Sequence, residues 1–343
     1  MQILENISLK PYNTFAIDAR SKFFNTFSSP AELEDYVMLY SQYPIFILGG
    51  GSNILFTGNY DGTVLKNEIK GIELMHEDVD YVYVKVGAGE NWHQFVLHCI
   101  EHHWAGVENL SLIPGNVGAA PIQNIGAYGV ELDDVFWSLE AFHMIERRLY
   151  TFTSTDCEFG YRDSIFKSKY KSEFAILSVT FQLKKKPVFH TSYGAITEEL
   201  DKMGVKELNI KAISDAVIKI RMSKLPDPAQ IPNAGSFFKN PEVPAEKYEE
   251  LKSEFPDIVA YPLVKGTVKL AAGWMIEQCG PDKIGTSWKG YRRGDAGCHA
   301  KQALVLVNYG NATGQEIYDL SEEILQSVQK KFGVTLEREV NII

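Results

Sequence analysis

The chain has 343 residues, a net charge of −10 and 45% hydrophobic residues. This length allows about two or three domains, and the 23% of charged residues is ordinary for a soluble globular protein. The acidic balance argues against nonspecific binding to nucleic acids or anionic membranes. Residues 219–301 carry 13 Lys and Arg against 10 Asp and Glu, so this segment is positive and suits a small anionic ligand.

Neither the cysteines nor the first residues indicate export or a metal site. The four cysteines are Cys99, Cys157, Cys279 and Cys298. No pair has C-x-x-C spacing, and His98 and His102 lack the glutamate position of an H-E-x-x-H motif. The opening MQILENISLKPYNTF resembles no secretory signal, and no apolar run approaches the roughly 20 residues that span a membrane. We expect a cytoplasmic protein with reduced thiols and no metal, and no nucleic-acid, membrane or protein partner.

The first half of the chain predicts helices that alternate with strands. Residues 28–43 are typical of a helix with Ser29 as N-cap and Pro30 in the first turn. The apolar run IFIL at 45–48 and the alternating run YVYVKV at 81–86 indicate strands. Residues 91–104 predict a second helix, and further strands are expected through about residue 184.

The second half predicts three helices before a last strand and helix. They cover residues 211–224, 244–255 and 269–280, and we expect Gly280 at the C-terminal cap of the third. The stretch LPDPAQIPNAG contains three prolines and indicates a domain boundary or a long active-site loop.

The clearest helix is the last one, after the strand ALVLVN at 303–308. Thr313 and Glu316 have the spacing of a capping box, and Gly333 ends the apolar periodicity. These local signals predict both ends of the helix.

Three glycine-rich stretches suggest a phosphate-bearing cofactor. They are FILGGGSNILF at 46–56, GAGENW at 87–92 and IPGNVGAAPIQNIGAYG at 113–129. Glycine has no Cβ, so backbone N–H groups can converge on an anion. The stretches match neither a P-loop nor a Rossmann fingerprint, and plain hairpins or a packing loop are the alternatives. The residues alone therefore indicate a multi-domain α/β-type protein with loops suited to such a cofactor.

The glycine stretches resemble the FAD-binding half of the vanillyl-alcohol oxidase superfamily. With further motifs, the chain resembles the UDP-N-acetylenolpyruvoylglucosamine reductase family from about residue 13 to residue 340. The motifs are NTFAIDAR, LGGGSNILF, IPGNVGAAPIQNIGAYG, FGYRDSIFK, RMSKLPDP, NAGSFFKNP, AGWMIEQCG and HAKQALVLVN. Tyr193, in HTSYGAITEEL, resembles the longer type of the family, in which a tyrosine loop folds over the substrate.

The resemblance implies an α+β fold, with a two-part FAD-binding domain of the PCMH type and a C-terminal α/β substrate-binding domain. The FAD-binding subdomains would cover 1–66 and 67–222, the second with the Tyr193 loop. The UDP-sugar domain would cover 223–332, and the tail 333–343 would return to the active site.

The resemblance also implies a reaction in peptidoglycan precursor synthesis. Bound FAD and the co-substrate NADPH would reduce UDP-N-acetylglucosamine enolpyruvate to UDP-N-acetylmuramate, with hydride passing from flavin N5 to C3 of the substrate. A flavin oxidase of the same superfamily is one alternative, against which NAGSFFKNP and RMSKLPDP argue. A noncatalytic flavin- or UDP-sugar-binding protein is another, and the retained catalytic motifs weaken it.

Three residues match the catalytic positions of the family. Ser236 would donate the proton to C2, and the planar fork of Arg162 would bind the carboxylate. Glu339 would either stay protonated and donate a hydrogen bond or stay charged and orient Arg162. The tail reads LEREVN, so Glu337 is a rival for this position, although the Glu-Val pair favours Glu339.

The remaining matches concern binding. The expected FAD-binding residues are Leu48, Gly49, Gly50, Gly51, Ser52, Asn53, Pro114, Gly115, Gly118, Ala119, Gln123, Asn124, Gly126, Ala127 and Tyr128. Tyr193 and Lys224 match diphosphate-binding positions, and Asn240 and Gln302 match positions near the substrate.

Overall fold

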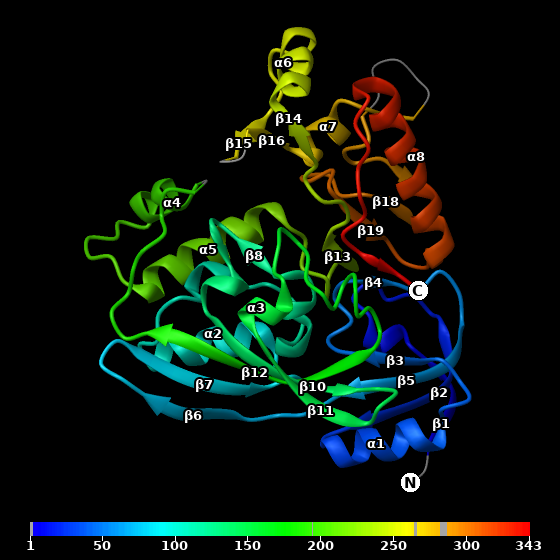
Figure 1. Ribbon diagram of the computed structural model, residues 1–343. Helices are drawn as coiled ribbons and strands as arrows, with labels where there is room; N and C mark the ends of the chain where they lie inside the picture. The colour runs from blue at the N-terminus through cyan, green and yellow to red at the C-terminus, as the bar shows by residue number, and fades with distance from the viewer. Residues whose placement is uncertain (1–2, 194, 264–265, 282–286) are drawn as a thin grey trace. The chain divides into compact units, whose positions relative to one another are not determined.

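The computed structural model describes residues 3–193, 195–263, 266–281 and 287–343 (Figure 1). The chain forms two compact units. Unit 1 contains residues 1–7, 21–51 and 61–223, and unit 2 contains residues 8–20, 52–60 and 224–343. Helices make up 29% and strands 30% of the structure, which agrees with the expected α+β class.

Unit 1 is built on two main sheets. Their strand orders are β1-β2-β5-β3 and β11-β10-β12-β7-β6, and β8 pairs with β9. The strands are β1 Leu4–Ser8, β2 Arg20–Phe27, β3 Ile45–Leu48, β5 Tyr60–Asn67, β6 Ile72–Glu77, β7 Tyr81–Gly87, β8 Gly126–Ala127, β9 Val130–Glu131, β10 Phe136–His143, β11 Arg148–Thr153 and β12 Phe174–Lys184. The helices are α1 Pro30–Leu39, α2 Trp92–Glu101, α3 Ser154–Cys157, α4 Ile196–Lys202 and α5 Ile210–Lys224, with 3-10 turns η2 Glu108–Leu110, η3 Val117–Ala119, η4 Pro121–Gln123 and η5 Leu132–Asp134.

Capping side chains fix the starts of two helices in unit 1. Ser29 accepts a hydrogen bond from the amide of Glu32 at 3.2 Å, which confirms it as the N-cap of α1. Asn91 caps α2 in the same way through the amide of Gln94. Each such cap satisfies an amide that has no partner within the helix, and it is worth about 1 kcal/mol.

The main core of unit 1 lies between α2 and the five-stranded sheet. Phe95 of α2 packs against Phe181 of β12 with ring centroids 4.7 Å apart, and Trp92 contacts both rings edge-on. These three side chains are buried, and burial of each stabilises the fold by roughly 2–3 kcal/mol. The chain segment that follows α2 therefore begins at a helix that is firmly packed on the sheet.

Unit 2 contains smaller sheets and the longest helix among the described residues. The strand orders are β13-β19-β18-β17 and β14-β16-β15, and β20 pairs with β4. The strands are β4 Ile54–Leu55, β13 Asn233–Ser236, β14 Glu242–Pro244, β15 Ala260–Pro262, β16 Thr267–Leu270, β17 Arg292–Arg293, β18 Ala296–Cys298, β19 Val305–Asn308 and β20 Asn341–Ile342. The helices are α6 Ala245–Glu254, α7 Ala272–Glu277 and α8 Gly314–Phe332, with a 3-10 turn η1 Lys10–Tyr12.

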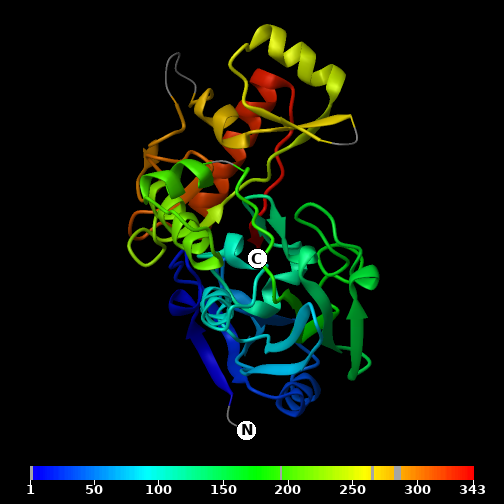
Figure 2. The same ribbon diagram turned by 90° about the vertical axis from the view of Figure 1, so that its left-hand side faces the viewer.

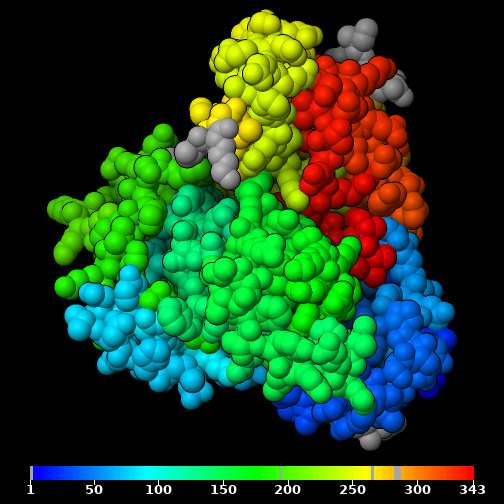
Figure 3. Space-filling view, viewed as in Figure 1, coloured from blue at the N-terminus to red at the C-terminus, as the bar shows by residue number. Residues whose placement is uncertain are grey.

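The helix α6 lies beside the sheet of β14, β15 and β16 (Figure 2). Figure 3 shows α6 in yellow and α8 in red at the surface of unit 2. The buried face of α8 packs on β18 and β19 through Ile317, Leu320 and Ile324. Unit 2 thus has a core of its own.

Both predicted ends of α8 are confirmed, whereas α7 differs from its prediction. The capping box of Thr313 and Glu316 is formed, and Gly333 takes a φ of +65° after the last turn. The helix α7 is six residues long because Lys269 and Leu270 belong to β16. It ends at Glu277 with Gln278 as its cap, so the prediction of Gly280 as the capping residue was wrong.

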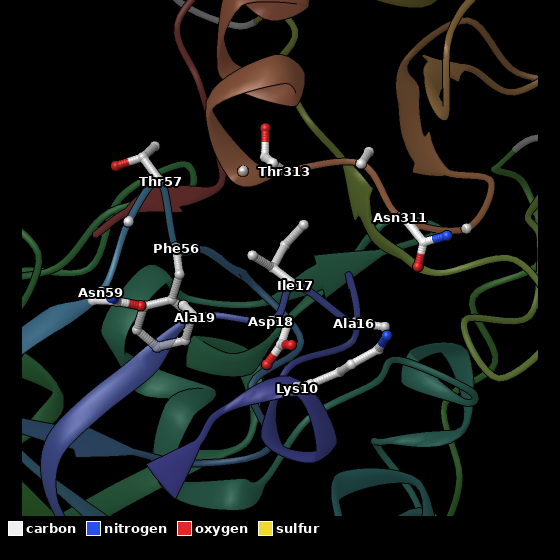
Figure 4. A pocket seen from close by; sticks show the side chains of 14 residues that line it. Lys10, Ala16, Ile17, Asp18, Ala19, Phe56, Thr57, Asn59, Asn311 and Thr313 are labelled. Atoms are coloured by element: carbon white, nitrogen blue, oxygen red, sulfur yellow. The ribbon is translucent and has the colours of Figure 1, made fainter. Parts of the chain in front are cut away.

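The first residue of α8 has no room for a side chain. A Cβ on Gly314 would lie 1.7 Å from the carbonyl oxygen of Phe56, and Figure 4 shows the adjacent Thr313 beside this segment. We expect Gly314→Ala to lower the free energy of unfolding by roughly 2–3 kcal/mol, because backbone must move to admit the methyl group. Urea titration of the variant measures this change.

Gly58→Ala is the matched control, because no heavy atom lies within 4 Å of the Cβ it would gain. Its free energy of unfolding should stay within about 1 kcal/mol of the parent value. Equal stability of the two variants would show that the start of α8 can shift without cost.

All four cysteines are free and buried. Burial raises the pKa of the Cys157 thiol and that of the Cys298 thiol to about 12, so both stay protonated at neutral pH. These two thiols are therefore unsuited to nucleophilic chemistry. Within the described part of the chain, no helix is long and apolar enough to cross a bilayer.

Candidate active site

The three glycine-rich stretches meet in unit 1. The second stretch bonds to the third through backbone groups: the amide of Val117 donates to Glu90 and the amide of Gly118 donates to Ala88, at 2.8 and 2.9 Å. The first stretch reaches the third at Gly50, whose missing Cβ would lie 2.9 Å from both the Asn116 Oδ1 and the Gly115 Cα. As predicted from its composition, the third stretch forms no α-helix: it contains the 3-10 turns η3 and η4 and the short strand β8.

This cradle fits a cofactor that carries phosphate groups. Gly51 and Gly115 have φ values of +63° and +114°, which orient successive amides in ways that other residues rarely allow. Side chains at Gly50 or Gly118 would fill the space between the loops, since a Cβ on Gly118 would lie 2.5 Å from that of Ala88. Backbone amides free of side chains can bind a diphosphate closely.

Gly50→Ala is expected to weaken FAD retention about tenfold or more, because the methyl group would push the two glycine loops apart. The ratio of flavin absorbance to polypeptide after gel filtration measures the loss. Gly160→Ala is the matched control in the same unit, since the nearest atom to its Cβ would be Asp163 Cβ at 3.9 Å. Full flavin content in the Gly50 variant would contradict the assignment of this loop.

Arg162 lies against the end of the third glycine stretch. Its Nη2 donates a 2.6 Å hydrogen bond to the carbonyl of Gly126, and its Nη1 would lie 3.1 Å from a Cβ on that glycine. Arg162 itself has a φ of +54°, and Lys167 donates to its carbonyl oxygen at 3.2 Å. The glycine at 126 thus makes room for the guanidinium.

Tyr128 and Tyr193 come together in unit 1. A Cβ on Gly129 would lie 3.4 Å from Tyr193 Cβ, so Tyr193 packs on Gly129, the residue that follows Tyr128. Tyr128 has a φ of +52° and packs against the buried face of α5 and α4. Burial is the main cause that raises the pKa of its phenol, and Tyr193 contributes to the increase.

Ser236 is the last residue of β13 in unit 2. Asn233 shapes the turn before it: its Oδ1 accepts from the amide of Gly235 at 2.8 Å, and its Nδ2 donates to Ile231 at 2.8 Å. Gly235 has a φ of +71°, which a residue with a side chain rarely adopts. Ser236 pairs with Val305 of β19, and the amide of Phe237 donates to the carbonyl of Leu304 at 2.8 Å, so hydrogen bonds fix the backbone before and after the serine.

The tail brings Glu339 next to Ser236. The amide of Glu339 donates to the carbonyl of Phe237 at 2.8 Å, one residue beyond the serine. Asn53 of the first glycine stretch donates to the carbonyl of Glu339 at 3.2 Å, also within unit 2. Glu337 differs, because its side chain is 73% exposed and pairs with Lys239 at 2.9 Å. The position near the serine therefore favours Glu339 over Glu337.

Two of the four predicted substrate-binding residues meet at the start of α7. Asn240 Oδ1 accepts from the amide of Ala272 at 2.9 Å, and Gln302 Oε1 would lie 2.8 Å from a Cβ on Gly273. Lys224 is exposed at the end of α5, and the side chain of Tyr193 is also exposed.

A cavity of about 370 Å³ in unit 2 lies away from all these residues (Figure 4). Its walls come from residues 16–19, 56–59 and 310–314 together with Lys10. None of the predicted catalytic, FAD-binding or substrate-binding residues lines it. Within the described ranges, no three His, Cys, Asp or Glu side chains are grouped to hold a metal ion.

Two positions in unit 1 were missed by the sequence analysis. Asn109 is buried, and its Nδ2 donates both to the carbonyl of Tyr128 at 3.0 Å and to that of His190 at 2.8 Å. Asn109 therefore joins the third glycine stretch to His190, which lies three residues before Tyr193. Arg221 lies three residues before Lys224 within RMSKLPDP, and this proximity was the one signal that could have identified it.

The two parts of the chain match two family models. Residues 22–144 match an FAD binding domain, and residues 227–343 match the C-terminal domain of UDP-N-acetylenolpyruvoylglucosamine reductase. The first match contains the Gly50 loop and the whole third glycine stretch, and the second contains Ser236 and Glu339.

Full-length relatives agree with both matches. The chain is 51% identical over 345 residues to the UDP-N-acetylenolpyruvoylglucosamine reductase of Amoebophilus asiaticus and 48% identical over 344 residues to that of Flavobacterium johnsoniae. Each alignment covers 100% of both sequences. The crystal structure of the UDP-N-acetylenolpyruvylglucosamine reductase of Thermus caldophilus has the same fold, with a TM-score of 0.69 at 23% identity over 100% of this chain and 99% of that one. The chain therefore belongs to the UDP-N-acetylenolpyruvoylglucosamine reductase family.

Proposed function

We propose that this chain reduces the enol ether of UDP-N-acetylglucosamine enolpyruvate to UDP-N-acetylmuramate, with NADPH as the electron donor and FAD as the bound cofactor. The observation that supports this proposal most directly is the backbone bond between Glu339 and Phe237, which puts a carboxyl-bearing residue beside Ser236. Membership of the family and the match to an FAD binding domain support the reaction and the cofactor.

The glycine stretches would hold the FAD diphosphate, and we propose Gly50, Gly51 and Gly115 among the residues that bind it. Once reduced by NADPH, bound FAD would supply the hydride that is added to C3 of the substrate. The substrate then carries negative charge at C2 and on the attached carboxylate. The residues of this chain have to stabilise that charge and deliver a proton to C2.

Arg162 would bind the substrate carboxylate. Its guanidinium is always charged at neutral pH, and its planar fork can form two parallel hydrogen bonds to a carboxylate. The bond from Nη2 to Gly126 and the positive φ fix the direction of the side chain before substrate arrives. A fixed donor stabilises developing charge without reorganisation in the transition state.

Ser236 would donate the proton to C2. An alcohol is a weak acid, but a carbanion-like carbon is a strong base, so the transfer is favourable once the hydride has been added. The pairing with β19 and the bond from the amide of Phe237 to Leu304 fix the backbone that carries this hydroxyl, which supports a role in general acid catalysis. Glu339 would either stay protonated and donate a hydrogen bond to the enolate or stay charged and orient Arg162.

We propose Tyr193, Lys224, Asn240 and Gln302 as the residues that bind the UDP-sugar. The start of α7, where Asn240 and Gln302 meet, supports this for two of them. We further propose that the chain acts in the cytoplasm, and the four free cysteines are consistent with a reducing compartment.

Anaerobic oxidation of NADPH by the purified protein tests the proposal. Sustained oxidation is expected only when UDP-N-acetylglucosamine enolpyruvate is present, and one equivalent per flavin is expected without it. A single reduction followed by turnover only when oxygen is admitted would instead show a flavin oxidase. UDP-N-acetylglucosamine, which lacks the enolpyruvyl group, is the control ligand and should support no turnover.

A further inference from the structure

Arg221 has one donor, its Nε, that lacks the partner which burial normally requires. It follows Ile220 near the end of α5, and its Nε is shielded from solvent and has no hydrogen-bond partner among the residues that the structure describes. A shielded charged donor that lacks an acceptor loses its hydration without compensation, which costs stability. Such a group is expected where a ligand supplies the missing acceptor.

The groups that shift the pKa of Arg221 are neutral or positive at neutral pH. Burial is the main cause that lowers the pKa of its guanidinium, and the charge of Arg162 lowers it further, whereas Tyr128 raises it. In the described part of the chain, no carboxylate is among the groups that shift it. The pKa of His93 is lowered by burial and then by Arg221, and its Nδ1 accepts a hydrogen bond from Leu112, so this ring is neutral.

Geometry brings the two arginines to the same part of unit 1. Tyr128 packs against buried residues of α5 that include Ile220, the residue before Arg221. Arg162 is bonded to Gly126, two residues before Tyr128. Arg221 and Arg162 therefore flank the end of the third glycine stretch. Two guanidinium groups near each other repel unless an anion lies between them.

We propose that Arg221 binds the carboxylate of the enol-ether substrate together with Arg162. This inference rests on the proposed function, because Arg162 is the arginine assigned to that carboxylate. The phosphates of NADPH and the diphosphate of the UDP-sugar are oxyanions too, so the experiment has to separate three sources of negative charge. The carboxylate is favoured because Arg162, the arginine assigned to it, is fixed beside the third glycine stretch, where Tyr128 also packs against the cluster that contains Ile220.

The experiment compares Arg221→Met, Arg221→Lys and the parent protein as FAD holoenzymes. Arg221→Met, which removes the guanidinium, should lower kcat/KM for the enol-ether substrate roughly 10- to 100-fold, the usual range for a hydrogen bond to a charged group. The lysine variant should recover part of this loss, because it keeps the charge but not the planar donors. Lys219→Met is the control, since it removes a charge from an exposed position of the same helix.

Two further readouts identify the anion. Reduction of the flavin by NADPH should change less than about twofold in Arg221→Met. Inhibition by UDP-N-acetylglucosamine, which has the diphosphate but no carboxylate, should also be unchanged. Slower flavin reduction by NADPH would mean that Arg221 binds NADPH. Weaker inhibition by UDP-N-acetylglucosamine would mean that Arg221 binds the diphosphate. Either result would overturn the proposal.

Thermal unfolding separates binding from a structural role. The unfolding temperature of ligand-free Arg221→Met should equal or exceed that of the parent, because an uncompensated buried donor is removed. Addition of the enol-ether ligand should stabilise the parent more than the variant, whereas UDP-N-acetylglucosamine should stabilise both equally. A lower unfolding temperature of the variant, together with an equal loss of stabilisation by both ligands, would make Arg221 a structural residue. Stabilisation by a ligand needs no turnover. If the proposed activity were wrong, the enol-ether ligand would fail to stabilise the parent protein as well, and this result differs from a failure of the inference about Arg221.

Discussion

Ser236→Ala is expected to slow the reoxidation of reduced flavin by the enol-ether substrate by about two or more orders of magnitude. Reduction of the flavin by NADPH should stay nearly unchanged, because no proton has to reach C2 in that half-reaction. The backbone around the serine is fixed by Asn233 and by the pairing with Val305, so loss of the hydroxyl should not disturb the strand. Anaerobic stopped-flow absorbance of the flavin follows each half-reaction separately.

Ser253→Ala is the control for this experiment. Its hydroxyl donates to the carbonyl of Glu250 on the exposed face of α6, and neither half-reaction should change when it is removed. If Ser236→Ala instead slowed both half-reactions equally, the serine would be a residue of the fold or of general ligand binding. The proton would then have to come from another donor.

Glu339→Gln has the second large effect that we expect, a loss of roughly 10²–10³ in kcat with the enol-ether substrate. The amide keeps the size and the hydrogen-bonding oxygen of the side chain, and the backbone bond to Phe237 does not involve the side chain. The loss would therefore report the carboxyl group itself. Steady-state kinetics at saturating substrate measures it, with the NADPH half-reaction as an internal reference.

Glu337→Gln is the matched control, two residues away on the same tail. Its carboxylate is largely exposed and pairs with Lys239 on the surface, an interaction worth at most about 1 kcal/mol. This variant should retain nearly full activity. If Glu337→Gln lost activity and Glu339→Gln did not, the alignment of the Glu-Val pair would be wrong and the catalytic carboxyl would be Glu337.

Features that depend on neighbours in the sequence were the most predictable. The N-cap at Ser29, the capping box of Thr313 with Glu316 and the stop at Gly333 involve residues a few positions from the helix ends, so the pattern contains all of the information. The error at α7 has a different origin. Lys269 and Leu270 pair with β14 and β15, and this long-range pairing overrides the helical tendency of the residues.

The candidate site was predictable where a motif contained it. Ser236, Arg162 and the glycine stretches lie in motifs, whereas the meeting of Ser236 with Glu339 depends on a backbone bond between distant segments. Arg221 could not be found from pattern alone. An arginine near a helix end usually faces solvent, and only the packed structure shows that its Nε is shielded and has no hydrogen-bond partner among the described residues.

The interleaved composition of unit 2 has a consequence for synthesis on the ribosome. Residues 8–20 and 52–60 emerge early, but their partners are residues 224–343, and β4 pairs with β20 at the far end of the chain. At 5–20 residues per second, these early segments wait roughly 15–60 s before the tail is made. Unit 1 can fold during that interval, since all of it precedes residue 224. Unit 2, which carries the proposed proton donor, can be completed only after β20 has been made, so we expect the nascent chain to be catalytically silent until then.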